Sequence, residues 1–299
     1  MRLTVLLLAV ALATSRLGLL AHELVGHGGA TKLVGGRVTD VQLFWFAGGW
    51  IRYQFAATPS TSALLVIAVG GVAVEAVCGA AMWLAIRGGG SGRLLLRAIG
   101  AVLVMHATWY FATGAWHGFG DGQLLYRELG SARYPVAILA GSITCGVGFL
   151  AARMIVGPLA SVAGWRGLAI AALLAGGIHA GLAIGEVKLR ADTTYTEVMQ
   201  PERERAVDRD LARWAAYEAQ HGPITPEARD AEHARLEQAH RTFPFAWLLA
   251  VCAVTAIFTG AWRSRRSEPI AIANRLLARA SSCAAIAVAT VIAIDLLTR

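Results

Sequence analysis

The first hydrophobic segment of the chain ends in two histidines and a glutamate, in the run His22-Glu23-Leu24-Val25-Gly26-His27. Histidine nitrogens are common zinc ligands, and a neighbouring glutamate can act as the general base that activates a water molecule. In the helical His-Glu-x-x-His pattern of zinc hydrolases the histidines are four residues apart. Here they are five apart. The run predicts a hydrolase site with Zn²⁺ bound by His22 and His27 and with Glu23 as base, provided that the helix between the two histidines lets both face the same side.

The condition concerns the shape of the helix between the two histidines. Side chains four residues apart on an α-helix differ in direction by roughly 40°, but those five apart differ by roughly 140°. A regular helix would therefore point His22 and His27 apart. A single-turn π-bulge would absorb the extra residue. Alternatively, the helix loosens at Gly26, Gly28 and Gly29. A chance arrangement is the plain alternative, but ionisable groups within membrane segments are functional by default.

A second polar cluster, residues 116–123, ends a later hydrophobic segment and offers a third ligand. Asp121 stands between two glycines, which is typical of a turn, but a zinc site also needs a third protein ligand. His117 lies four residues earlier, on the same face of a helical turn, and competes for that place. We favour Asp121 as the ligand, with His117 as a partner of the ligands or a stabiliser of the oxyanion.

The composition favours a membrane protein. Hydrophobic residues make up 56% of the 299 residues and charged residues 15%, against about 25% charged in a typical soluble domain. The net charge of +8 sits in short clusters between apolar runs, as at Arg263, Arg265 and Arg266. We therefore expect contact with the lipid bilayer and no nucleic-acid partner. The four cysteines lie in apolar runs without metal or disulfide spacing, so we expect free, buried thiols.

Apolar runs of about 20 residues, long enough to cross a bilayer, recur along the chain. We predict an all-α polytopic membrane protein with about six to seven transmembrane helices, at 3–26, 61–86, 94–116, 134–156, 167–186, 243–262 and 280–297. The stretch 134–186 could instead form one span plus a re-entrant piece, because glycines and a proline interrupt it. The first run could be a signal peptide. It continues past Arg16 into His22, however, so Arg16 would snorkel or face the protein interior.

Two segments do not have the pattern of spans. Residues 38–56 are rich in β-branched and aromatic side chains around Gly48-Gly49, which predicts a β-hairpin at the membrane interface or inside the protein. Residues 187–241 hold 9 of the 27 basic and 11 of the 19 acidic residues, which predicts an extramembrane hairpin of two amphipathic helices. The expected division is a catalytic membrane core at 1–130, further membrane helices at 131–186, the hydrophilic hairpin at 187–241 and C-terminal membrane helices at 242–299.

The order of these elements resembles the site-2 protease family of zinc intramembrane metalloproteases. That family has a zinc motif on an early span, a small-residue helix, a β element with Gly-Gly, a glycine-opened helix and a later Asp-Gly. The similar segments here are His22–Ala30, Leu33–Val38, Phe46–Trp50, Gly70–Glu75 and Asp121-Gly122. The resemblance covers about residues 18–125. It implies zinc bound by His22, His27 and Asp121, and Glu23 as general base.

The resemblance also implies a substrate and a place for it. The substrate would be a membrane-embedded helical segment, partly unwound, which could add to the edge of the hairpin at 38–56. Gly48, Gly49 and Glu75 would take part in docking it, although Glu75 stands where the family often has Asn. The expected location is a bacterial cell membrane, with several spans.

Two other functions remain open. A displaced His27 would leave an inactive pseudoprotease or scaffold that binds membrane segments. A transporter could instead use Glu75, His179, Glu186 and Asp295 as relays. Pairing within the helix bundle is the default expectation for Glu75 and Asp295. His179 and Glu186 are seven residues apart on one helical face and could form a polar pair with each other. The orientation is also open. Arginines in the short loops favour an N-terminus inside the cell, whereas bacterial members of the family often place zinc toward the cytoplasm, which requires the opposite.

Overall fold

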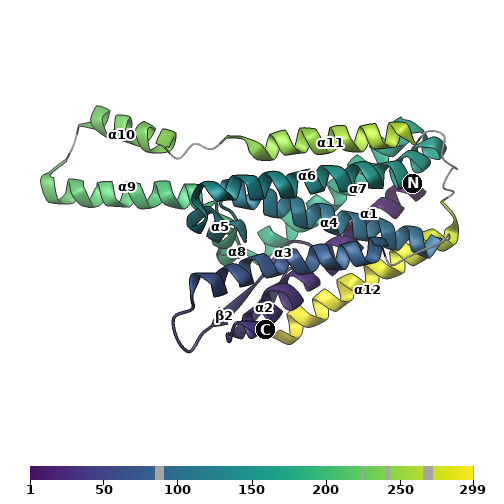
Figure 1. Ribbon diagram of the computed structural model, residues 1–299, viewed down its shortest axis with the longest axis horizontal. Coiled ribbons are helices and arrows are strands. Elements are labelled where there is room, and N and C mark those ends of the chain that lie inside the picture. Colours follow the sequence, from purple (N-terminus) through teal and green to yellow (C-terminus); the bar gives the residue numbers. More distant parts are fainter. Residues whose placement is uncertain (85–90, 224, 240–242, 265–271, 299) are drawn as a thin grey trace.

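A computed structural model describes residues 1–84, 91–223, 225–239, 243–264 and 272–298, and the chain is mostly helical (Figure 1). The α-helices are α1 (Arg2–Leu20), α2 (Gly28–Leu33), α3 (Thr61–Leu84), α4 (Ser91–His117), α5 (Gly122–Glu128), α6 (Arg133–Ala151), α7 (Gly157–Arg190), α8 (Thr193–Met199), α9 (Glu202–His221), α10 (Pro226–Ala239), α11 (Phe245–Arg263) and α12 (Asn274–Thr298). Two π-helices, η1 (Ala21–His27) and η3 (Ala152–Val156), and a 3₁₀ turn, η2 (Gly130–Ala132), join some of them. The strands are β1 (Arg37–Leu43) and β2 (Gly49–Gln54).

Six helical stretches of the described chain are long and apolar enough to cross a membrane, which fits a multi-pass membrane protein. The longest, Gly130–Arg190, has 61 residues. A straight helix of that length would reach about 90 Å, three times the thickness of the hydrocarbon core. It breaks at Gly164, where φ is 70° and ψ is 155°. Its two arms correspond to the predicted spans 134–156 and 167–186, and the six stretches fall within the predicted six to seven.

The first helix lies at the centre of the bundle. It packs against α12, α7 and α4, and its residues Leu6 and Ala13 are buried against Ile99 of α4. An N-terminal segment used in this way is part of the fold, as expected for a span. Large apolar side chains cover the outside instead, as with Leu173 and Trp247, which are 75% and 76% exposed. Such a surface suits lipid contact.

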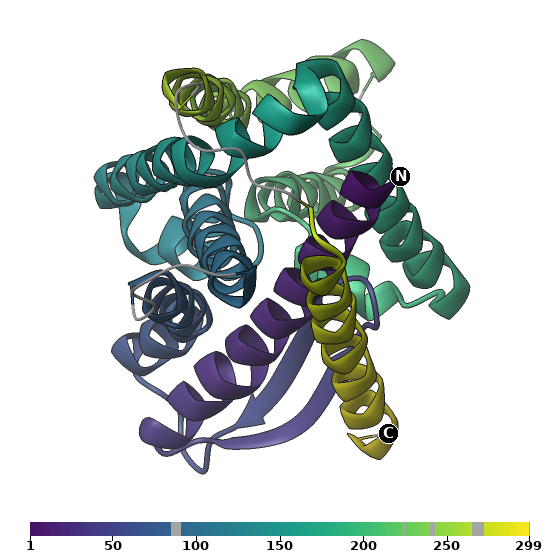
Figure 2. The same cartoon turned by 90° about the vertical axis from the view of Figure 1, so that its right-hand side faces the viewer.

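The predicted hairpin at 38–56 is confirmed. Strands β1 and β2 pair antiparallel, with Val41 opposite Ile51 and Leu43 opposite Gly49. The hairpin lies against α12 and η1, where α1 and α12 end (Figures 1 and 2).

The hydrophilic section contains the two predicted helices and one more. Helices α9 and α10 form the expected hairpin, which projects beyond the bundle at the left of Figure 1. Helix α8 precedes them and was not predicted. The four cysteines are free, as predicted, but none is fully buried and Cys252 is exposed. Residues 85–86 of the second predicted span, and Arg265 and Arg266, lie outside the described residues.

Candidate metal centre

The helix that carries the histidine motif is a π-helix from Ala21 to His27. Its wider turn places residues five apart above one another, so His22 and His27 point to the same side. Their Nε2 atoms are 3.1 Å apart. Of the two shapes that the spacing allowed, the π-bulge is therefore confirmed, and the helix does not loosen: Gly28 continues it with α-helical dihedral angles.

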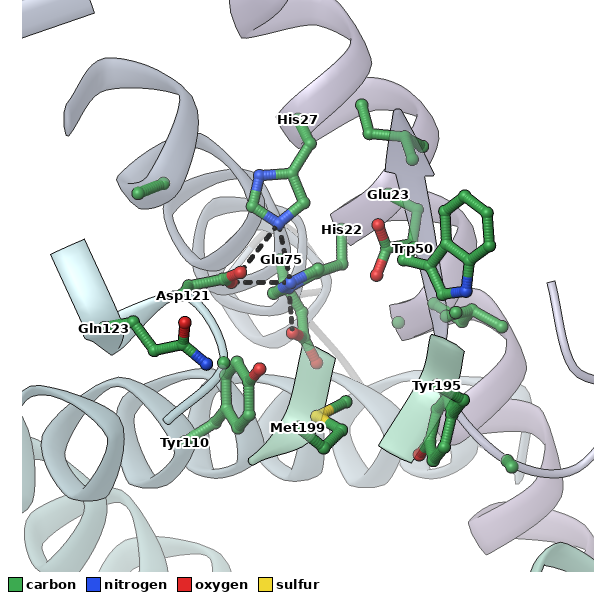
Figure 3. Close-up of a pocket in the computed structure, with 18 of the residues that line it drawn as sticks. His22, Glu23, His27, Trp50, Glu75, Tyr110, Asp121, Gln123, Tyr195 and Met199 are labelled. Atoms are coloured by element: carbon green, nitrogen blue, oxygen red, sulfur yellow. Dashed lines mark hydrogen bonds and ion pairs between the residues drawn. The ribbon is translucent and has the colours of Figure 1, made fainter. Parts of the chain in front are cut away.

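Asp121 meets both histidines from the loop that follows α4. Its Oδ2 lies 2.9 Å from Nε2 of His22, and its Oδ1 lies 3.2 Å from Nε2 of His27 (Figure 3). Gly118 and Gly120 adopt positive φ angles that turn the chain back toward the motif. The structure thus brings together the three residues predicted as ligands.

The two Nε2 atoms and the carboxylate of Asp121 lie close enough together to hold a metal ion. Tetrahedral ligands at about 2.0–2.2 Å from zinc lie about 3.3–3.6 Å from one another. The three observed separations, two of which join different oxygens of Asp121 to the histidines, are shorter by only a few tenths of an ångström. Within the part of the chain that the structure describes, Oδ2 of Asp121 is buried and has no donor in hydrogen-bond geometry, although His22 is close. Two imidazoles and one carboxylate are also a ligand set that catalytic zinc sites use.

The second nitrogen of each histidine is already held. Nδ1 of His27 donates to the carbonyl oxygen of Ile67 at 2.7 Å. Nδ1 of His22 contacts the carboxylate of Glu75 at 3.3 Å. Such partners fix the ring orientation and the tautomer of metal-binding histidines, and they leave Nε2 for the metal. The other oxygen of Glu75 contacts Nδ1 of His106 at 2.7 Å.

Glu23 completes the cluster. It is 6% exposed, and its carboxylate and the ligand atoms of His22 and His27 all lie within 4.8 Å of one another. Figure 3 shows Glu23 on the Trp50 side of His22, with Asp121 on the opposite side. If His22, His27 and Asp121 held a metal ion, this carboxylate would lie beside the ligands and could act on a water molecule bound there.

Glycines at two contact points, Gly26 and Gly71, let α3 pack directly against the histidine motif. A Cβ atom at Gly71 would lie 2.6 Å from Nε2 of His27 and 2.8 Å from Nε2 of His22. A Cβ atom at Gly26 would lie 2.5 Å from the Cα of Gly71. The glycine-opened helix predicted at 70–75 therefore lets both Nε2 atoms approach α3 at Gly71, where any side chain would crowd them.

The site opens into a cavity of about 660 Å³. Gly48, Gly49 and Trp50 line it, together with Tyr53, whose pKa is raised by burial. The two glycines predicted to dock a substrate thus face the same cavity as His22, Glu23, His27 and Asp121.

Helix α8 closes one side of the cavity. Tyr195 and Met199 of this helix line it. The ring of Tyr195 packs on Phe44 at 4.7 Å, and its hydroxyl meets the backbone of Gly48. Burial raises the pKa of Tyr195 as well. At the C-terminal end of α8, the carbonyl of Gln200 accepts a hydrogen bond at 3.1 Å from the side chain of Gln123, two residues after Asp121.

Other predicted residues lie elsewhere or have other partners. His117 is not brought to the cluster: its Nε2 accepts from the backbone N–H of Ala246 at 3.3 Å. His179 pairs with Ser15 at 3.1 Å. Glu75 and Asp295 are buried and paired within the bundle, as expected. Glu186 is buried too, but it pairs with Arg190 at 2.8 Å, so the expected pair of Glu186 and His179 does not form.

Sequence reasoning missed two residues at the site. His106 was not predicted to line the site. It bonds to Glu75, and its side chain is 61% exposed and lines the cavity. Tyr195 lies in the hydrophilic section, where no sequence pattern connects it with a motif more than 150 residues earlier.

No protein-family model, curated protein or solved structure matches the chain. The geometry of the site therefore carries the functional argument.

Proposed function

We propose that this protein is a zinc-dependent intramembrane peptidase of the site-2 protease type, which cleaves membrane-embedded helical segments. One observation carries the proposal: His22, His27 and Asp121 converge at the end of a membrane-length helix, with Glu23 beside them. The fixed Nδ1 atoms of both histidines support it further, because they leave the ligand atoms free to bind an ion.

The chemistry follows from the roles of these residues. A zinc ion held here would polarise a peptide carbonyl and acidify a water molecule. Glu23 accepts the proton of the attacking water and delivers it to the leaving amide nitrogen. Glu75 and the carbonyl of Ile67 keep the two imidazoles oriented throughout. Glu75 is fully engaged by His22 and His106, so we assign it to positioning in preference to substrate docking.

The substrate has to reach the site in an extended form, because the carbonyl groups of a helix are bonded internally. The hairpin offers a place for it. Gly49, Trp50 and Ile51 at the start of β2 line the cavity next to the cluster. An extended segment added along this strand would bring its backbone to Glu23, with the pairing of β-augmentation.

The ends of the helices favour one orientation. Arg93 and Arg97 of α4 and Arg275 and Arg279 of α12 lie in the first turns of their helices, whereas the metal cluster lies near the opposite helix ends. Since arginines concentrate on the cytoplasmic side, we propose that the N-terminus is inside and that the cavity opens on the other side of a bacterial cell membrane.

The test is a comparison of the wild type with Glu23→Gln, both purified in detergent. We expect about one zinc ion per chain in each, and cleavage of a single-span reporter by the wild type only. The loss should be on the order of 100-fold or more, as for removal of a general base. Full zinc-dependent cleavage by Glu23→Gln would show that Glu23 is not the base.

The alternative of an inactive scaffold rested on a His27 that points away from the metal. Its Nε2 lies 3.1 Å from that of His22, which removes this reason. A wild-type protein that binds zinc and membrane segments but cleaves none of them would favour the scaffold.

A further inference from the structure

The loop between β1 and β2, residues 44–48, is bound by a buried arginine on one side. Arg16 of α1 is 3% exposed, in the middle of a membrane-length helix. Its guanidinium donates to the carbonyl oxygens of Phe44 at 2.6 Å, Phe46 at 3.1 Å and Ala47 at 2.6 Å. This settles the direction of Arg16: it faces the interior and does not snorkel.

A buried glutamate binds the other side of the same loop. Glu186 of α7 is 8% exposed. Its carboxylate accepts from the backbone N–H groups of Trp45 and Phe46, both at 2.6 Å, and of Ala47 at 3.2 Å. One cation therefore holds the carbonyl groups of the loop and one anion holds its N–H groups.

A second pair of charges supports the first. Arg190 of α7 contacts Glu186 at 2.8 Å and Asp295 of α12 at 3.0 Å. The indole N–H of Trp45 donates to Asp295 at 2.9 Å. The two cations and two anions balance, so the group carries no net charge when all four are ionised. A buried charge network is a weak source of stability, because desolvation offsets the attraction. Several charges of this network contact the same loop, 44–48, which indicates that the network fixes the position of the loop.

We propose that Arg16 and Glu186 are positioning residues for substrate docking. Together they hold the loop 44–48 so that Gly48 and the start of β2 face the cavity beside Glu23. This inference rests on the proposed function. The inference extends the proposed site to helix α7, which lies outside the segment that resembles the site-2 protease family.

The two residues touch the loop and neither the metal ligands nor Glu23. Their loss should therefore weaken substrate binding and leave the chemical step intact. Hydrogen bonds to a charged group are each strong enough that losing one shifts an equilibrium by on the order of tenfold. We expect KM of Glu186→Gln for a cleaved single-span peptide to rise by on the order of tenfold, with kcat and zinc content close to those of the wild type.

The experiment compares Glu186→Gln and Arg16→Lys with a control, Thr144→Val. The control removes a buried hydrogen bond between helices, the one between the hydroxyls of Thr108 and Thr144 at 2.7 Å, away from the cavity. Hydrogen exchange of the peptide covering residues 42–50 is measured first, since it does not depend on activity. The amides of 45–47 should exchange faster in the two loop variants and at the wild-type rate in the control.

Each outcome has a meaning. Unchanged exchange in both loop variants, or a fall in kcat at constant KM, overturns the positioning role. A variant that fails to fold shows itself by loss of zinc and by fast exchange throughout, in which case the conservative Arg16→Lys decides. If the wild type binds zinc but cleaves nothing, the proposed function fails, while the exchange data still decide whether the two charges order the loop.

Discussion

Substitution of Gly71 by alanine tests whether His22 and His27 hold a metal ion in the proposed arrangement. The added Cβ would lie 2.6 and 2.8 Å from the two Nε2 atoms, and ordinary contact begins near 3.4 Å, so the nitrogens would have to retreat by about 0.8 and 0.6 Å. Zinc sites tolerate ligand displacements of about 0.2 Å. We therefore expect Gly71→Ala to lower zinc affinity by on the order of 100-fold or more.

The matched control is Gly79→Ala, eight residues along the same helix. A Cβ atom there would lie 2.7 Å from the carbonyl oxygen of Gly100. The substitution would therefore strain the packing of α3 on α4 without touching His22, His27 or Asp121. Zinc content after competition with a chelator, and the midpoint of thermal unfolding, are measured for both. Both variants should unfold earlier, but only Gly71→Ala should lose zinc. Wild-type zinc affinity in Gly71→Ala would refute a metal site between His22 and His27.

Three other variants test the surroundings of the site. Deletion of Val25 leaves His-Glu-Leu-Gly-His, whose histidines face together on an ordinary α-helix, so zinc affinity should stay within about tenfold of the wild type; loss of zinc would mean that the π-helix is needed for more than alignment. Glu75→Gln should lower zinc affinity by about 10–100-fold, because the orienting carboxylate of His22 is lost; chelator competition measures this, and an unchanged affinity would contradict the role. His117→Ala should keep wild-type zinc content and turnover, since His117 bonds to Ala246; a loss of zinc would restore it as a ligand.

The local features of the fold could be predicted from the sequence. A span is a run of apolar residues and a hairpin is an alternation around glycines, so both are properties of neighbouring residues. The ligand set was also accessible, because zinc chemistry demands a third ligand and Asp121 stood at the end of a span. The resemblance to a known family supplied the rest of that prediction.

The surroundings of the site could not be predicted in the same way. Arg16 and Glu186 are 170 residues apart, and each alone has only the pattern of a costly charge in a membrane helix. Their shared loop appears only once the helices are packed. Tyr195 likewise contacts Gly48 only in the folded protein, and no local sequence pattern predicts this contact.

The π-helix at the motif has a consequence for how such sites are found in other chains. A pattern written as His-Glu-x-x-His passes over this sequence, although its two imidazoles point at one place. A single inserted residue within a helix is absorbed when the turn widens, and the flanking α-helical segments continue on either side. Alignments that score such an insertion as a broken motif would discard sites of this kind, and a pattern that admits one optional residue between the histidines would retain them.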